Sequence, residues 1–232
     1  VCDDYLPLFR QAAQKYGIKL NDSQLACAPV KSDEGKQYLS AMAAAANYAW
    51  ANRQIITKLI RNVFERALNK SYESLSMSLL YDVSHNMARI EKHGSRQLCV
   101  HRKGATRALP RNHPLVPAEY KSTGQPVILP GDMMRHSYIL AGEEGASEVF
   151  YSCSHGAGRV MSRGEAVRFG KGRDITGELN EKGVIVRART RGLLSEEAPF
   201  AYKNSADVAA VIEKAGISRR VASLRPFAVV KG

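Results

Sequence analysis

One helical pattern governs the first third of the chain. From Ser32 to Lys70 the sequence reads SDEGKQYLSAMAAAANYAWANRQIITKLIRNVFERALNK, and its apolar side chains recur with the period of an α-helix. Ser32 is suited to cap the first turn, acidic residues follow it, and basic residues gather at the far end, as the helix dipole favours. We predict one long helix, or two with a bend near Ala51 and Asn52, whose apolar stripe packs into a core. The stripe comprises Leu39, Met42, Ala46, Ala49, Ile56, Ile60, Val63 and Ala67.

The rest of the chain mixes predicted strands and helices. A helix around Tyr5–Tyr16 ends near Gly17, another begins near Ser162, and a third spans the amphipathic segment DVAAVIEKAGI. Short apolar or alternating runs predict strands at residues 97–105, 126–129, 137–142, 183–190 and 221–232, and a strand that runs into a loop at 148–159. No internal repeat or linker interrupts the chain. We therefore predict one α+β domain over residues 1–232, with mixed β-sheets packed against helices.

The balance of charge indicates a polyanionic partner. The chain has 34 lysines and arginines against 22 acidic residues, a net charge of +12, which places nucleic acid first among partners. Aromatic residues make up only 7%, so no base-stacking platform of the single-strand-binding kind is evident. No apolar run approaches the length of about 20 residues that a membrane span needs, and the first residues lack the pattern of a signal peptide. We expect a soluble cytoplasmic protein without a disulfide framework, because the four cysteines are widely scattered.

Three of the six histidines stand beside small or polar residues instead of in an apolar stripe. His85 lies in YDVSHN, His101 opens HRKGATRA, and His155 opens HGAGR. Such settings are unusual for a histidine that only fills a core. Their spacing matches no local metal motif, so the fold would have to assemble any metal site.

Two of these histidines lie in basic, glycine-containing segments, HRKGATRA and HGAGRVMSRG. The fork of an arginine matches phosphate oxygens, and glycine allows backbone N–H groups to approach an anion. Either segment alone could be a solvated basic turn. Together they indicate phosphoryl or nucleotidyl transfer, in which a neutral imidazole attacks phosphorus. Asp132, in the turn PGDMMRHS, could accept a hydrogen bond from a base or bind a metal, although a turn acid is more often structural.

Several long motifs occur in the order that is typical of one family. They read YDVSHNMARIEKH, VHRKGATRALP, GQPVILPGDM, SYILAG, CSHGAGRVMSR, EAPFAYKN and LRPFAVVKG. With them, most of residues 30–232 resembles the RtcB family of RNA ligases. The resemblance implies an RtcB-like fold and a GTP- and manganese-dependent ligase for RNA repair or tRNA splicing. Such a ligase joins an RNA 3′-phosphate or 2′,3′-cyclic phosphate end to a 5′-hydroxyl end. An archease-like activating protein is a further partner that it suggests.

The resemblance also implies roles for individual residues. His155 would be the nucleophile that forms a histidine–GMP intermediate, and His85 would bind one of the two manganese ions of a complete family site. The nucleotide-binding residues would be Asn86, Pro130, Gly131, Asp132, Met133, Ser137, Gly156, Ala157, Gly158, Tyr202 and Lys231, the last of which would reach the guanine. RNA phosphates would meet Arg102, Arg107, Arg159 and Arg163.

The chain also departs from the pattern of that family. The earlier family motifs Asp-x-x-Cys-Gly, Gly-Asn-His and His-Thr-Gly-Ser-Arg, which carry further metal ligands, do not occur in it. Gly-Asp-Met-Met replaces Gly-Ser-Met-Gly, and Asn204 stands where aspartate is frequent. We therefore expect the C-terminal part of a ligase. Two alternatives remain, an inactive RNA- or nucleotide-binding fragment and an enzyme that caps 3′-phosphate ends with GMP without joining them.

Overall fold

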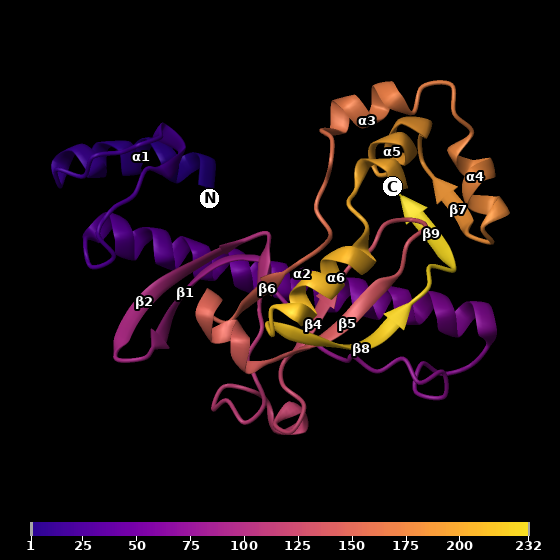
Figure 1. Cartoon of the computed structure of the whole chain (residues 1–232), viewed down its shortest axis with the longest axis horizontal. Helices are drawn as coiled ribbons and strands as arrows, with labels where there is room; N and C mark the ends of the chain where they lie inside the picture. Colours follow the sequence, from indigo (N-terminus) through magenta and orange to yellow (C-terminus); the bar gives the residue numbers. More distant parts are fainter. Residues whose placement is uncertain (1, 232) are drawn as a thin grey trace. The chain divides into compact units, whose positions relative to one another are not determined.

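The structure is a computed structural model that describes residues 2–231, except for the side chains of Cys2, Arg191 and Lys231. Its helices and small sheets form the α+β architecture that the sequence predicts. Two compact units divide the chain. One unit contains residues 1–82 and 87–101, and the other contains residues 83–86 and 102–232. Figure 1 shows the elements of both units, coloured along the sequence.

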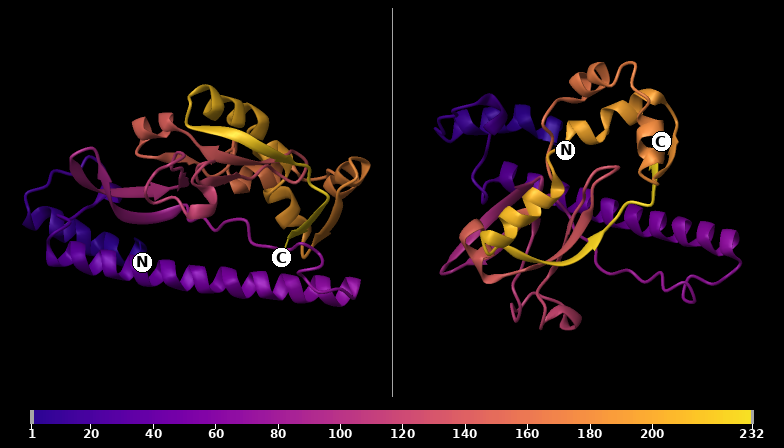
Figure 2. Two further views of the ribbon diagram at one scale, coloured as in Figure 1. Left: turned by 90° about the horizontal axis from the view of Figure 1, so that it is seen from below. Right: turned by 45° about the vertical axis from the view of Figure 1, so that its right-hand side comes forward.

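The first unit is dominated by the long helix α2, Asp33–Leu68, which follows helix α1, Cys2–Lys15, and the short 3₁₀ helix η1, Ser23–Leu25. The Ser32 side chain accepts a hydrogen bond from the backbone N–H of Gly35 and caps α2 as predicted. The helix runs through residues 51 and 52 without a break, as Figure 2 shows, so the alternative of a single helix is correct. Strands β1, Asn86–His93, and β2, Arg96–Lys103, form a hairpin.

The prediction that the apolar stripe of α2 packs into a core is wrong for the described residues. Gly35 is the one buried residue of this helix in the described part, and the side chains of Ile56, Ile60 and Val63 are 44%, 47% and 53% exposed. Within this unit α1 packs against the start of α2, where Tyr38 meets aromatic rings of α1. The helical period of a sequence shows that a face is apolar, but it does not show which element covers that face.

The largest sheet of the second unit has three antiparallel strands in the order β4–β5–β8. Strands β4, Pro126–Leu129, and β5, Ser137–Gly142, have the predicted bounds, and β8 spans Ser218–Leu224. Helix α6, Ser205–Lys214, packs against this sheet. A buried hydrophobic core of this unit comprises Ala108, Val127, Leu129, Tyr138, Leu140, Ala146, Cys153, Ala209 and Ile212.

The end of the chain forms two strands instead of the single predicted one. Strand β9, Ala228–Lys231, leaves the sheet of β8 and pairs in parallel with β7, Ile185–Ala188. Pro226 stands between the two strands. Because proline has no backbone N–H to donate to a sheet, it ends one strand before the next begins.

Short elements complete the second unit. Strands β3, Ala105–Arg107, and β6, Ser152–Ser154, pair antiparallel. The remaining elements are η2, Ala118–Tyr120; η3, Glu144–Val149; α3, Arg163–Phe169; α4, Ile175–Glu181; α5, Arg191–Glu196; and η4, Pro199–Ala201. Ser162 and Glu165 form a reciprocal capping box at the start of α3, where the sequence predicts a helix. A second apolar core joins α4, α5 and β7.

Neither membrane spans nor disulfides are found in the part of the chain that the structure describes. Among residues 2–231, no helix is both long enough and apolar enough to cross a bilayer. The thiols of Cys27, Cys99 and Cys153 are free.

Candidate functional site

Two histidines that are distant in the chain stack on each other in the second unit. The ring centroids of His85 and His155 are 4.7 Å apart, and the ring planes differ by 7°. His85 precedes strand β1, and His155 follows strand β6 directly. Burial lowers the pKa of His155 below its ordinary value, and the neighbouring His85 lowers it further. His155 therefore favours the neutral imidazole, which is the form that can act as a nucleophile.

Gly104 holds the basic segment 101–108 against this pair. Its backbone N–H donates hydrogen bonds to the carbonyl oxygen of His85 at 2.9 Å and to Oδ1 of Asn86 at 3.2 Å. The glycine has a φ of +68°, and a Cβ at this position would lie 3.2 Å from Nε2 of His155. Only glycine combines this backbone conformation with so close an approach. The structure thus brings Asn86, His85 and His155 together around one glycine.

The loop that follows His155 is fixed by local hydrogen bonds. The hydroxyl of Ser154 donates to the carbonyl of Gly156 at 2.6 Å, and Lys203 N–H donates to the carbonyl of Gly158 at 3.0 Å. A Cβ on Gly156 would lie 4.0 Å from the carbonyl oxygen of Pro130. The loop 156–158 and the turn at Pro130, both predicted to bind nucleotide, are therefore neighbours.

Most polar groups of the turn 130–137 are occupied by the turn itself. The Asp132 side chain is 1% exposed, and its carboxylate accepts hydrogen bonds from the backbone N–H of Met134 and from both the backbone and the guanidinium of Arg135. The backbone N–H of Gly131 donates to the Ser137 hydroxyl at 3.0 Å. Of the two readings of Asp132, this geometry favours the structural one. A direct contact of Asp132, Ser137 or the buried Met133 with a nucleotide stays a prediction.

Arg135 connects this turn to the segment 199–203. Besides Asp132, its Nη1 donates to the carbonyls of Pro199 and Tyr202, both at 3.1 Å. No signal in the sequence distinguishes this arginine from other surface arginines.

Tyr202 lies in a network with Arg159 and Glu197. The Tyr202 hydroxyl donates a short hydrogen bond to Glu197 and accepts one from Nη1 of Arg159 at 2.7 Å. The guanidinium of Arg159 also lies 4.7 Å from the centroid of the Tyr202 ring and donates to the carbonyls of Met161 and Glu196. Burial raises the pKa of Tyr202, and the hydrogen bond to Glu197 adds to this effect.

The four arginines that the sequence assigns to RNA differ in how accessible they are. Arg102 is 4% exposed and donates to the Ser152 hydroxyl and the Phe150 carbonyl. Arg107 exchanges hydrogen bonds with the buried Gln125, and Arg159 is held as described above. The side chain of Arg163 is 71% exposed and pairs with Glu196. Phosphate contacts of all four remain predictions, and the geometry leaves Arg163 most open to one.

Comparison with known proteins identifies the family. The family model described as tRNA-splicing ligase RtcB matches residues 1–232. The chain belongs to the RtcB family. It is similar to the tRNA-splicing ligase RtcB of Archaeoglobus fulgidus, with 52% identity over the whole chain and 49% of that relative. The corresponding protein of Methanocaldococcus jannaschii is 49% identical, and the RNA-splicing ligase RtcB of Mycobacterium bovis is 48% identical, with 24% and 53% of their lengths covered.

These values also show how much of an RtcB protein is present. The chain spans about half or less of the length of the three relatives, while the whole chain is matched in each case. The resemblance seen in the sequence is confirmed. The names of these relatives therefore refer to polypeptides that are longer than the 232 residues of this chain.

The manganese site that the resemblance implies stays a prediction. Within residues 2–231, no three His, Cys, Asp or Glu side chains converge as metal ligands. His85 stacks on His155, but a firmly held transition metal needs several oriented ligands. Lys231 lies in β9, where its backbone pairs with Ala188, and its side chain is outside the described part of the structure. His101, the third unusual histidine, belongs to the first unit and stacks on Tyr38.

Proposed function

We propose that this chain carries the nucleophilic histidine of a GTP- and manganese-dependent RNA ligase. The ligase joins RNA 3′-phosphate or 2′,3′-cyclic phosphate ends to 5′-hydroxyl ends, in RNA repair or tRNA splicing. Membership of the RtcB family supports the reaction class. The observation that carries the assignment is the setting of His155, whose ring stacks on His85 and lies against Gly104, and whose pKa is lowered.

In the proposed first step, a ring nitrogen of His155 attacks the α-phosphorus of GTP. A nitrogen–phosphorus bond forms and pyrophosphate leaves. The GMP group then passes to the RNA 3′-phosphate, and the 5′-hydroxyl of the second RNA displaces GMP as the ends join. A neutral ring is required for the first step because a protonated imidazole has no free electron pair on either nitrogen.

The residues around His155 support nucleotide binding by their shape. Gly104 lies against the ring, a Cβ on Gly158 would meet no atom within 4 Å, and the Pro130 carbonyl lies next to Gly156. Tyr202 is held by Glu197 and Arg159, so its ring is fixed before any ligand arrives. In this proposal the loop 156–158 follows the phosphates and the turn at Pro130 borders the base.

The proposal is tested by labelling with GTP whose α-phosphate is radioactive, in the presence of manganese. We expect the complete protein to acquire an acid-labile, base-stable label, and His155→Ala to abolish it. His93→Ala, which changes a histidine of strand β1 in the first unit, is the matched control. The chain of residues 1–232 should label weakly, because its described residues supply too few metal ligands. Labelling that survives His155→Ala would show that another residue is the nucleophile.

Two other functions are separated by the products. An enzyme that caps RNA would leave GMP on a 3′-phosphate even when a 5′-hydroxyl RNA is present, whereas a ligase releases GMP and yields a longer RNA. RNA or nucleotide binding without catalysis is favoured by the lack of three converging metal ligands among residues 2–231. In that case RNA would bind in a salt-dependent manner and no label would form.

A further inference from the structure

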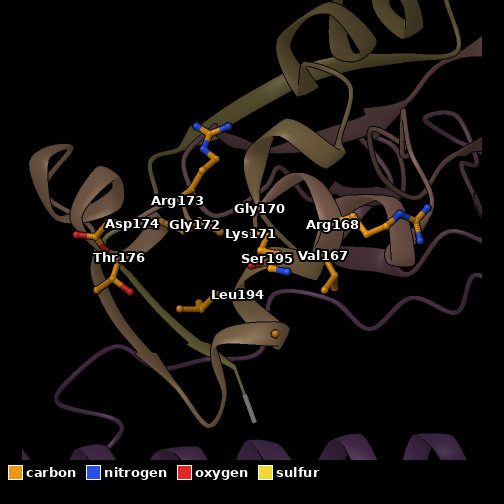
Figure 3. A pocket seen from close by; sticks show the side chains of 12 residues that line it. Val167, Arg168, Gly170, Lys171, Gly172, Arg173, Asp174, Thr176, Leu194 and Ser195 are labelled. Carbon is orange, nitrogen blue, oxygen red and sulfur yellow. The ribbon is translucent and has the colours of Figure 1, made fainter.

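A cavity of about 780 Å³ lies in the second unit, outside the segments that surround His155. Helix α3, the loop 170–174, the start of α4 and helix α5 form its walls. Figure 3 shows Asp174 and Thr176 on one side of it and Val167 and Arg168 on the other, with Lys171, Ser195 and Leu194 between them. A cavity of this size can hold a ligand as large as a nucleotide.

The loop that lines the cavity is built close to α5. A Cβ on Gly170 would lie 2.8 Å from the hydroxyl oxygen of Ser195, so the backbone of the loop and the helix are in contact. Gly172 has a φ of +84°, and a Cβ there would meet no atom within 4 Å. The glycines therefore allow a tight turn beside open space. Glycine also leaves the backbone accessible to a ligand.

The cavity combines a buried apolar surface with positive charge. Ile175 and Leu194 line it and are 5% and 6% exposed. The carboxylate of Asp174 caps α4 by accepting from the backbone N–H of Gly177, which offsets part of its charge. None of the ion pairs found among the described residues involves Lys171, whereas the charge of Arg168 helps to lower the pKa of the Glu165 carboxylate.

Arg173 has a different role in the same wall. It donates two hydrogen bonds to the Glu178 carboxylate, at 3.0 and 2.9 Å, and its guanidinium lies over the rings of Phe169 and Phe200. Figure 3 shows its guanidinium pointing away from Leu194. Arg173 therefore fixes the loop, whereas Lys171 is exposed and carries its charge in the lining of the cavity.

We propose that this cavity binds one unpaired nucleotide of the RNA substrate. The base lies against the apolar lining, in which Val167 is 40% exposed, and the ammonium of Lys171 contacts its phosphate. Proteins that bind single-stranded RNA combine cations for the backbone with side chains that contact the base, commonly aromatic ones. In this cavity the contact with the base is aliphatic. The proposal rests on the RNA-ligase function proposed above, and it assigns a second contact region for that substrate.

The position of α5 supports a link to the His155 site. Leu194 and Ser195 line the cavity, and the following residues, Glu196 and Glu197, hold Arg163 and Arg159. These arginines follow His155 in the chain by a few residues. The cavity and the arginines that follow His155 therefore share helix α5 and the residue after it as a common wall.

Fluorescence anisotropy of a short single-stranded RNA with a 3′-phosphate tests the proposal on the 232-residue chain. We expect Lys171→Glu and Thr176→Trp each to raise the dissociation constant about tenfold or more, the first by repelling phosphate and the second by filling the cavity without a change of charge. Lys171→Arg and Thr176→Ser should bind as the unchanged chain does. Lys214→Glu, the same charge change on the exposed end of α6, should have a much smaller effect.

The outcomes separate this proposal from others. Equal losses for Lys171→Glu and Lys214→Glu would show a general effect of charge and overturn it, as would normal binding by Thr176→Trp. Competition by free GTP that is lost in Thr176→Trp would assign the cavity to a free nucleotide instead. Circular dichroism identifies variants that do not fold. Labelling of His155 in the complete protein should be unchanged in Lys171→Glu, and a lack of labelling in the unchanged protein would contradict the ligase proposal without affecting the RNA-binding result.

Discussion

The imidazole rings of His85 and His155 are nearly parallel, with their centroids 4.7 Å apart. His85 at this distance disfavours a positive charge on His155, because like charges repel. Replacement of His85 by glutamine removes that repulsion, so we expect the pKa of His155 to rise. It should stay below its ordinary value because burial is the larger cause of the shift. A titration followed by nuclear magnetic resonance without added metal measures this, with His136→Gln as the control. A pKa that falls or does not move in His85→Gln would contradict the geometry.

The same shift predicts how stability depends on pH. The pKa of His155 is lower in the folded chain than the ordinary value of 6.5, so the unfolded chain takes up a proton first as the pH falls. The contribution of this residue to the free energy of unfolding is therefore complete above pH 6.5 and decreases below it. We expect the free energy of unfolding, measured with denaturant above and below that pH, to fall less on acidification in His155→Gln than in the unchanged chain.

Gly104→Ala should slow the reaction at His155 in addition to lowering the stability of the fold. A left-handed conformation costs a residue other than glycine about 1–2 kcal/mol, and the new methyl group would also press on Nε2 of His155. Gly94→Ala is a matched control, because Gly94 has a φ of +60° but no atom within 4 Å of the added methyl group. We expect both variants to lose similar stability in thermal unfolding. Only Gly104→Ala should lower the rate of GMP labelling in the complete protein, by about tenfold or more. Similar labelling in both variants would show that the contact with His155 has no role.

Arg135→Ala should destabilise the second unit. The substitution removes one hydrogen-bonding partner from the buried carboxylate of Asp132 and removes the link to the carbonyls of Pro199 and Tyr202. We expect a loss of about 2 kcal/mol in denaturant unfolding. Arg111→Ala, which breaks a more exposed ion pair with Glu143, should cost about 1 kcal/mol or less. Addition of Asp132→Asn to Arg135→Ala should restore part of the loss, and a further loss instead would mean that the charge of Asp132 matters elsewhere.

The pair Glu213–Arg220 predicts acid sensitivity where α6 meets β8. The hydrogen bond from Arg220 lowers the pKa of Glu213 below its ordinary value of 4.5. Because the folded pKa is depressed, the pair stabilises the fold above pH 4.5 and this contribution is lost as the pH falls through the lowered pKa. Glu213→Gln should thus melt at a lower temperature than the unchanged chain near neutral pH, with a difference that narrows in acid. Glu181→Gln, on an exposed position of α4, should show no such difference.

Elements with a strong local signal could be predicted from the sequence. Ser32 predicts where α2 begins, and the helical period predicts that the segment is a helix. Pro126 and the Pro-Gly turn after Leu129 predict the bounds of β4. The helices α4 and α5 have seven and six residues, too few for a period to be visible, and they were missed. Strand β1 was missed as well, because NMARIEKH has no regular alternation to distinguish it from a loop.

For the site, the sequence could indicate residues but not directions. His85 and His155 were selected by their small or polar neighbours, yet their stacking depends on the fold of the second unit. Arg102 illustrates the limit. A basic, glycine-containing segment predicts a phosphate contact, but its guanidinium is buried against Ser152 and Phe150. Residue type shows that a charge is present, whereas packing decides whether the charge faces solvent.

The exposed apolar side chains of α2 have a practical consequence for experiments on the isolated chain. A helix of 36 residues is about 54 Å long, and along its second half Ile55, Leu59, Val63 and Leu68 are all more than half exposed. An exposed apolar surface of this kind promotes association between molecules in water. Purified preparations should self-associate at high concentration and bind hydrophobic dyes such as anilinonaphthalene sulfonate. Light scattering across a dilution series should therefore precede every affinity measurement, because an aggregated sample would raise the anisotropy and mimic tight RNA binding.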